Sequence, residues 1–113
     1  MTYNFHLNAD MFYKVQSHSK RVECRVNDSR HSVLRKNDNI CFINRENEDE
    51  FVIAIVHEVL HFSSFLELFT KIPVVECGFD ISTTAEDAAK YMRRYYDEAA
   101  ESLGAVAIVF SLK

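Results

Sequence analysis

The sequence predicts an α+β fold, with a small and mostly antiparallel sheet or barrel and a few short helices around it. Strand-like segments and short amphipathic segments follow one another in the order β-α-β-β-β-α-α-β. Long helices do not separate the strands regularly, which argues against a parallel doubly wound sheet. Only two glycines and one proline interrupt the 113 residues, so the connections must be short. This length predicts one domain spanning residues 1–113.

The first half of the chain contains two predicted strands and a helix. Residues 2–8 (TYNFHLN) alternate apolar and polar side chains, as does the segment 20–26 (KRVECRV), and both patterns are typical of half-buried strands. Between them, residues 8–16 predict a short helix that begins at Asn8, a favourable N-cap residue. The segment 28–34 (DSRHSVL) predicts a turn or a single helical turn.

The second half predicts three further strands and two helices. Residues 38–62 indicate two strands joined by a charged turn around residues 46–50. The segment 63–73 predicts a short helix that begins with a capping box and ends at a proline. Residues 83–104 predict the longest helix, which ends at a glycine. Residues 105–112 (AVAIVFSL) carry no charge and predict a buried final strand.

Charge is distributed unevenly along the chain. The net charge is −4 overall, yet residues 1–45 hold eight Lys/Arg against four Asp/Glu. A protein that coats nucleic acid non-specifically is basic overall, which this chain is not. Any anion is therefore expected in a local basic site in the first half. The alternative is that the two halves simply neutralise each other in the fold.

The three cysteines are widely spaced and form no C-x-x-C pair, which predicts reduced thiols rather than disulfides or a zinc site. No apolar run is long enough to cross a bilayer, and residues 1–10 lack the pattern of a signal peptide. We therefore expect a cytoplasmic protein that uses no membrane and no cofactor.

The segment His57–His61 reads HEVLH and matches the zinc-peptidase signature H-E-x-x-H. That signature needs a helix, because only a helix brings residues four apart onto one metal. Here it continues the β-branched run FVIAIV, and two histidines four apart in a strand lie about 13 Å from each other. We predict a chance match in a strand, with both histidines on one face of the sheet, and no metal.

The segment HSKRVECRVNDSR concentrates charge on a predicted strand. Arg21, Glu23 and Arg25 share one face of that strand, and Lys20 lies at its start. A glutamate between two guanidinium groups stays ionised and holds them in place. Such arginines suit the recognition of phosphate or carboxylate. An exposed strand face with alternating charges is an equally strong interpretation of the pattern alone.

The chain resembles the ASCH family (activating-signal-cointegrator homology), whose members have a PUA-like β-barrel. That family carries G-x-K-x-x-E-x-R on an early strand, and five further motifs follow it. Here His18 and Asn37 replace two glycines of the family pattern. The resemblance covers nearly the whole chain and rests on six segments in the same order: HSKRVECR, LRKNDNICF, FSSFLELF, ECGF, MRRYYDEAAESLG and AVAIVF.

This resemblance implies a cleft that binds RNA, a nucleotide or a modified nucleoside. Lys20, Glu23 and Arg25 are expected at the bottom of the cleft, with Arg30 joining from the turn and Phe79 from the loop after the short helix. In such a cleft Lys and Arg would meet phosphate, and an aromatic side chain would stack on a base.

An enzyme is the alternative that the resemblance implies, since one branch of the family is similar to N4-acetylcytidine amidohydrolases. Catalysis would then involve Lys20, Glu23 and Glu76. In that branch, however, a threonine stands where this chain has Glu23. A carboxylate does not replace a hydroxyl as acyl acceptor without a change of mechanism.

A protein partner is a third possibility, through the tyrosine-rich segment YMRRYYDE at residues 91–98. Tyrosine and arginine are enriched in interface hot spots. The same spacing also fits a helix stripe that faces the core, which is the interpretation that we favour.

Overall fold

The computed structural model describes residues 1–113 and contains five strands, four α-helices and one 3-10 helix. The strands are β1 (Thr2–Leu7), β2 (Val22–Val26), β3 (Asn39–Asn44), β4 (Phe51–Phe62) and β5 (Ala105–Leu112). The helices are α1 (Ala9–Gln16), α2 (Phe65–Lys71), α3 (Ala85–Met92) and α4 (Glu98–Glu101), and the 3-10 helix is η1 (Val74–Cys77). The predicted order of strands and helices is thus largely confirmed.

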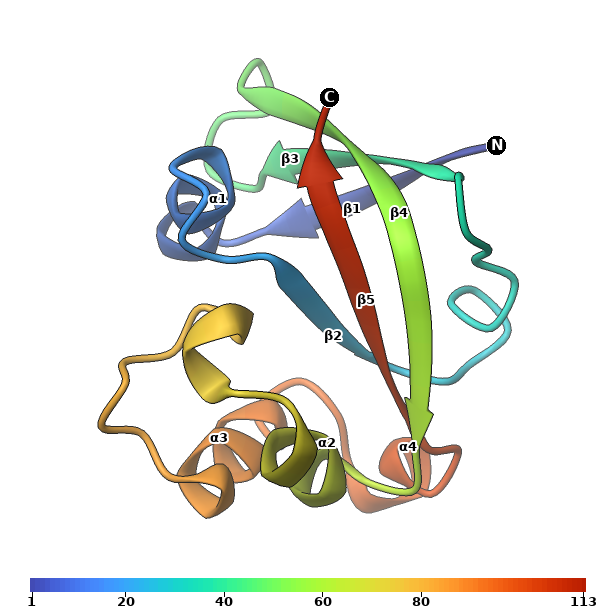
Figure 1. The fold of residues 1–113 in the computed structure, drawn as a ribbon, viewed down its shortest axis with the longest axis vertical. Coiled ribbons are helices and arrows are strands. Elements are labelled where there is room, and N and C mark those ends of the chain that lie inside the picture. The colour runs from blue at the N-terminus through green and yellow to red at the C-terminus, as the bar shows by residue number, and fades with distance from the viewer.

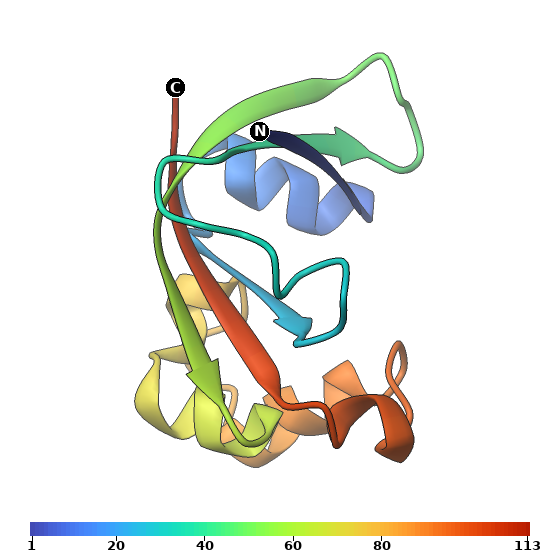
Figure 2. The same ribbon diagram turned by 90° about the vertical axis from the view of Figure 1, so that its right-hand side faces the viewer.

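The five strands form one curled sheet in the order β1-β3-β4-β5-β2 (Figures 1 and 2). The pair β1–β3 is parallel and the other three pairs are antiparallel. Strands β1 and β2 are the two edges and do not pair with each other, so the sheet is a half-barrel. The predicted small, mostly antiparallel barrel is thus confirmed in its mostly antiparallel pairing, but the barrel is not closed. Side chains, rather than backbone hydrogen bonds, fill the space between the two edges.

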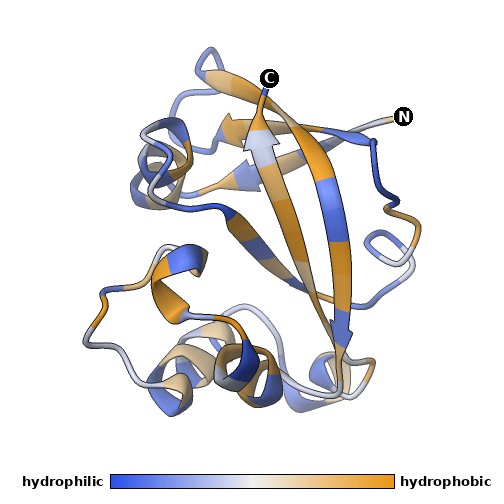
Figure 3. Cartoon of the chain, viewed as in Figure 1, coloured by the Kyte–Doolittle hydropathy of each residue, from blue (hydrophilic) through white to orange (hydrophobic).

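Two clusters of buried side chains lie on opposite faces of the sheet. Along β5, Val106, Ile108 and Phe110 belong to the cluster inside the curl, which also contacts α1. The alternate residues Ala105 and Ala107 belong to the second cluster, against α2, α3 and η1. Because both faces of β5 are covered, the strand is hydrophobic along most of its length (Figure 3). The helices α2, α3 and α4 gather at one end of the sheet (Figure 1).

The long helix predicted over residues 83–104 is in fact two helices. Helix α3 ends at Met92, and Asp97 caps a new helix by accepting a hydrogen bond from the backbone N–H of Ala100 at 2.8 Å. Between them Tyr96 turns inward and stacks on Phe65 with 5.7 Å between ring centroids. The Asp97 cap and this aromatic contact explain why the chain turns within an otherwise helical pattern.

The HEVLH segment lies in β4, as predicted, and does not form a helix. The pairing of β4 with β5 shifts by one residue between Val56 and Glu58, so His57 is the extra residue of a β-bulge. A bulge reverses the alternation of side chains, and His57 and His61 therefore lie on opposite faces rather than on one. His57 contacts the Ser111 hydroxyl at 2.6 Å. The structure contains no group of three His, Cys, Asp or Glu that could hold a metal.

The two residues that replace glycines of the family pattern have positive φ angles, +68° at His18 and +75° at Asn37. A side chain in this region costs about 1–2 kcal/mol, whereas glycine in a fixed backbone costs about 0.5–1 kcal/mol. We expect His18→Gly and Asn37→Gly each to raise the free energy of unfolding by up to about 1 kcal/mol, with the larger gain at His18. Urea denaturation measures this change.

The neighbouring Ser17, at a φ of −84°, provides the control. Ser17→Gly adds flexibility without relieving strain and is expected to destabilise the protein. If His18→Gly destabilised it as much as Ser17→Gly does, the positive φ angle would carry no strain.

Candidate ligand-binding pocket

A pocket of 260 Å³ opens between the two free edges of the sheet. Strands β1 and β2 supply one wall, and η1 and the segment from α3 to α4 supply the other. This volume is near the lower end of the range of about 300–1,000 Å³ that is usual for small-molecule sites. The lining residues are His6, Leu7, Asn8, Met11, Lys20, Glu23, Cys24, Arg25, Arg45, Cys77, Phe79, Tyr91, Met92, Tyr95 and Tyr96.

Lys20 lies at the base of the pocket and is only 4% exposed. Its Nζ donates to the carbonyl oxygens of Val22 at 2.9 Å and Cys77 at 2.7 Å, and lies 3.1 Å from Glu23 Oε1. An ammonium group has three donors, and each of them has an acceptor within the protein. Lys20 therefore joins β2 to η1 and fixes one side of the Glu23 carboxylate.

Gly78 allows η1 to approach Lys20 this closely. Its φ is +94°, and a Cβ at this position would lie 2.9 Å from Met11 Sδ and 3.1 Å from Lys20 Cδ. Any larger residue would push against the lysine stem and strain the backbone. The glycine of the ECGF segment thus keeps the Cys77 carbonyl within reach of the ammonium group.

Glu23 is 4% exposed and is held from both sides. Its Oε1 faces Lys20, and its Oε2 accepts a hydrogen bond of 2.6 Å from Arg25 Nε. Burial by itself would raise the pKa of Glu23, but the charges of Lys20 and Arg25 outweigh burial, and the pKa is lower than usual. Glu23 is consequently a carboxylate at neutral pH and acts as an acceptor only.

Arg25 lies at the mouth of the pocket with its side chain 19% exposed. Its guanidinium carbon lies 4.5 Å above the Phe5 ring, a cation–π contact, and Nη2 reaches the His6 carbonyl at 3.4 Å. Burial would lower the pKa of Arg25, yet the carboxylate of Glu23 raises it, so the group stays charged. Glu23 takes the Nε edge and the His6 carbonyl takes one Nη2 donor, so the guanidinium group keeps further N–H donors at the mouth of the pocket.

Aromatic side chains form the opposite wall of the pocket. Phe79 meets Tyr91 edge-to-face at 5.3 Å, and the Tyr91 and Tyr95 hydroxyls lie 3.2 Å apart. Tyr96 stacks on Phe65 in the core behind the wall. Tyr95 is 52% exposed at the rim. The wall is rigid at its base and accessible at its edge, and a flat aromatic ligand can stack against such a surface.

All three cysteines are free thiols, and Cys24 and Cys77 lie in the pocket wall. The hydrogen bond with Cys77 and burial raise the pKa of the Cys24 thiol well above its usual value. Cys24 is therefore an uncharged, inert part of the wall rather than a nucleophile.

The structure brings together four of the residues predicted for the site, namely Lys20, Glu23, Arg25 and Phe79. Arg30 lines a neighbouring hollow that shares His6, Arg25 and Arg45 with the pocket. Glu76, expected as a catalytic residue, is half-buried but does not line the pocket. Its backbone carbonyl accepts from Arg21 N–H at 2.8 Å, and the carbonyl of the next residue, Cys77, accepts from Lys20.

Arg21 does not share the environment of Glu23 and Arg25. Strand β2 begins only at Val22, and the exposed Arg21 side chain reaches back to the His18 carbonyl at 3.4 Å. Of the three charges predicted on one face, only Glu23 and Arg25 lie together. The second cation beside Glu23 is Lys20 rather than Arg21.

Several pocket residues were not predicted from the sequence. Arg45 follows β3, His6 lies near the end of β1, and Asn8 caps α1 just after it, so these residues meet β2 only through the curl of the sheet. The tyrosines were interpreted as a stripe facing the core. One sequence feature could have indicated Arg45 as a site residue: it is a cation of the basic first half and immediately precedes an acidic turn.

The arrangement places three cations and one carboxylate around an aromatic cleft: Lys20, Arg25 and Arg45 against Glu23. The free guanidinium edges suit an anionic or carbonyl group. The remaining lone pairs of Glu23 suit an amino group. The predicted local basic site in the first half of the chain corresponds to this excess of cations.

The lowered pKa of Glu23 predicts a stability change in acid. The pKa is 4.5 for an unperturbed glutamate and lower in the folded state. The ionised carboxylate therefore stabilises the fold fully above pH 4.5, and this contribution is lost as the pH falls through the native value. We expect Glu23→Gln to be less stable than the wild type at neutral pH and to lose less stability on acidification.

Urea denaturation at a series of pH values tests this, with the exposed Glu98→Gln as the control. The control should follow the wild-type curve. Parallel curves for Glu23→Gln and the wild type would contradict the pairing of Glu23 with two cations.

Comparisons with known proteins identify the family and the fold. A family model described as the ASCH domain matches residues 6–113. The crystal structure of hypothetical protein PH0355 has a TM-score of 0.86 at 23% identity, and the match covers 100% of both chains. No curated protein matches the chain.

Two further solved structures share the fold at lower similarity. The solution NMR structure of protein PF0455 from Pyrococcus furiosus has a TM-score of 0.77 at 22% identity, over 99% of this chain and 97% of that chain. The crystal structure of ASCH from Zymomonas mobilis has a TM-score of 0.68 at 13% identity, over 96% of this chain and 68% of that chain. At these identities the likeness concerns the fold. None of the helices is long and apolar enough to cross a membrane.

Proposed function

The chain belongs to the ASCH domain family, and on this premise we propose that its pocket binds a nucleotide, either free or as part of single-stranded RNA. The observation that carries the proposal is the buried Lys20–Glu23–Arg25 trio beneath an aromatic wall. A protein buries such charges at a cost, and all three residues line a cleft that also offers aromatic side chains for stacking.

Each part of the pocket matches a part of a nucleotide. The rings of Phe79, Tyr91 and Tyr95 offer a surface for stacking on a base, which is worth about 1–3 kcal/mol per base. Glu23 accepts from an exocyclic amino group, and Arg25 donates to a carbonyl or phosphate oxygen. The acidic second half of the chain makes extended coating of RNA unfavourable, so a compact ligand in this local site fits the charge distribution better.

Hydrolysis of an N-acylated nucleoside is the alternative that the geometry favours less. A catalytic lysine or glutamate needs a free donor or a basic lone pair. All three donors of Lys20 are engaged within the protein, and Glu23 is a weak base because two cations lower its pKa. Glu76, the remaining candidate, lies outside the lining.

A thermal-shift screen of the purified protein tests the proposal, with nucleosides, acetylated nucleosides, nucleotides and short single-stranded RNAs as probes. A ligand that binds the native state raises the melting temperature by mass action. Shifts with nucleotides or RNA, and no product by chromatography, are the expected result. Deacetylation of an acetylated nucleoside would replace binding by the hydrolase alternative, and no shift with any probe would refute the proposal.

A further inference from the structure

A second hollow of 340 Å³ continues the pocket on the side of β1. Its lining comes from β1, from Arg25 on β2, from the loop after β2 and from the residue after β3. The residues are Asn4, Phe5, His6, Arg25, Arg30, His31 and Arg45. No carboxylate lines it, whereas three guanidinium groups do.

The acidic residues around this hollow contact its lining, but they leave the guanidinium groups of Arg30 and Arg45 without a carboxylate partner. Glu23 takes the Nε edge of Arg25, and Glu48 contacts His6 Nε2 at 2.9 Å. Asp28 contacts His31 Nδ1 at 2.8 Å and accepts from the backbone N–H of Arg30. Neither the Arg30 nor the Arg45 guanidinium lies within 4.0 Å of a carboxylate.

The base of the hollow is fixed in place. His31 is 5% exposed, meets the Phe5 ring edge-on at 5.4 Å and contacts the Val26 carbonyl at 3.1 Å through Nδ1. Arg25 lies against the other side of the base, over the Phe5 ring. Arg25 and Arg45 both direct an Nη2 toward the His6 carbonyl, at 3.4 and 3.5 Å, which brings the two guanidinium groups next to each other.

Two adjacent guanidinium groups repel each other unless an anion lies between them, and Arg30 adds a third. Planar guanidinium groups bind phosphate oxygens in pairs through charge-assisted hydrogen bonds. We propose that this hollow is a phosphate subsite, formed by Arg25, Arg30 and Arg45, and that the ligand of the neighbouring pocket carries its phosphate there.

This inference rests on the proposed function and makes it more specific. The pocket and the hollow share His6, Arg25 and Arg45, so they are contiguous. A base against the tyrosines and a phosphate on the arginines would form one ligand that spans both. The preferred ligand is then a nucleotide rather than an uncharged nucleoside.

Calorimetric titration with each ribonucleoside and its 5′-monophosphate at low salt tests the inference. A charge-assisted contact predicts that the monophosphate binds about 10-fold or more tightly than the nucleoside. R30Q and R45Q should each move the ratio of the two affinities toward one, because each removes a phosphate donor. Both side chains are exposed and have no ion pair, so the variants should fold normally, which circular dichroism verifies.

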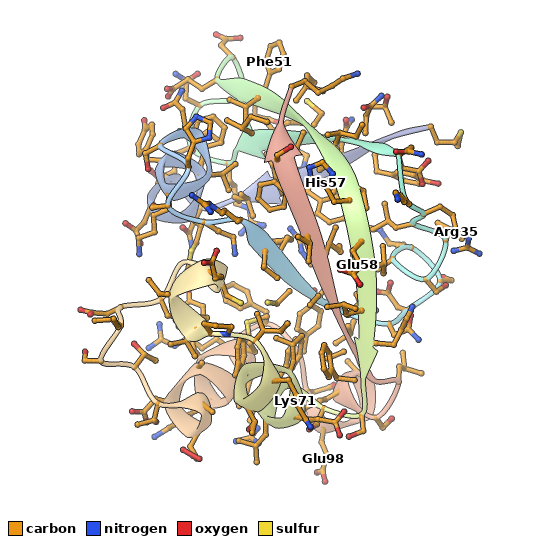
Figure 4. The ribbon with its side chains drawn as sticks, viewed as in Figure 1. Arg35, Phe51, His57, Glu58, Lys71 and Glu98 are labelled. Carbon is orange, nitrogen blue, oxygen red and sulfur yellow. The ribbon has the colours of Figure 1, made fainter.

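Arg35→Gln is the matched control. Arg35 lies on the same loop as Arg30 and is exposed, but it donates to the Ser32 and Leu34 carbonyls and lines neither site (Figure 4). In R35Q the ratio of the monophosphate and nucleoside affinities should equal that of the wild type. An equal loss in R30Q and R35Q would mean a general effect of net charge and would overturn the subsite.

A titration with inorganic phosphate separates failure of the subsite from failure of the proposed function. Equal binding of nucleosides and monophosphates would overturn the subsite and leave the function intact. Phosphate binding that is lost in R30Q and R45Q, without binding of any nucleoside or monophosphate, would refute the function and support the subsite. Absence of binding by every probe would overturn both.

Discussion

Replacing Lys20 by methionine is expected to lower the free energy of unfolding by about 3–5 kcal/mol, the usual result of removing one partner from a buried ion pair. Methionine keeps the length and apolar stem of lysine but removes all three donors. The carbonyls of Val22 and Cys77 then lose their hydrogen-bond donor, and Glu23 retains only Arg25. Urea denaturation measures the loss, which is a large share of the stability of a small domain.

Lys14→Met is the matched control for this prediction. Lys14 donates to the Gly78 carbonyl at 2.8 Å, next to the carbonyl that Lys20 contacts, and pairs with Asp10 at 3.3 Å. Its side chain is 37% exposed, so its loss should cost less than about 1 kcal/mol. Equal losses in the two variants would show that the buried trio is no more important to the fold than a surface lysine.

Arg25→Ala is expected to weaken binding of the nucleotide about 30-fold or more, since loss of one partner of a buried charged contact costs about 2 kcal/mol or more. Arg25 is one of the three residues that line both the pocket and the adjacent hollow. The fold should tolerate the change better than Lys20→Met, because Glu23 keeps its contact with Lys20. Calorimetry gives the affinity, and urea denaturation gives the stability.

Arg21→Ala provides the control for Arg25→Ala. Arg21 immediately precedes β2, is exposed and lines neither site. Arg21→Ala removes one positive charge close to Arg25 in the chain. This variant should leave the affinity for the nucleotide within about twofold, as expected for an exposed charge. Unfolding of Arg25→Ala with unchanged affinity in the remaining folded protein would make the charged strand structural.

Local patterns in the sequence predicted most of the fold. Alternation and β-branched runs identify all five strands, and the N-termini of α1 and α2 follow from their caps. The parallel pairing of β1 with β3 and the open edges depend on contacts between distant segments, which no local pattern reveals. The break after Met92 was missed because the helical periodicity continues across it, while the packing of Tyr96 on Phe65 overrides it.

The candidate site was predicted in part, for the same reason. Lys20, Glu23 and Arg25 lie within six residues of one another, so a single motif reveals them. Arg45 and the tyrosines reach the pocket only through the curl of the sheet. Three of the tyrosines line the pocket, so the predicted stripe facing the core explains the tyrosine-rich segment only in part. Glu76 was expected in the site, but the residue after it, Cys77, lines the pocket and contacts Lys20.

We expect a nucleotide to bind between the open edges of the half-barrel. Titration of isotopically labelled protein with a ribonucleoside monophosphate, followed by NMR of the backbone amides, tests it most directly. The largest shifts should fall on β2, on the end of β1 and on the segment from Tyr91 to Tyr96. Shifts centred instead on the outer face of β4 around His57 and Glu58 (Figure 4), or no shifts at all, would contradict it.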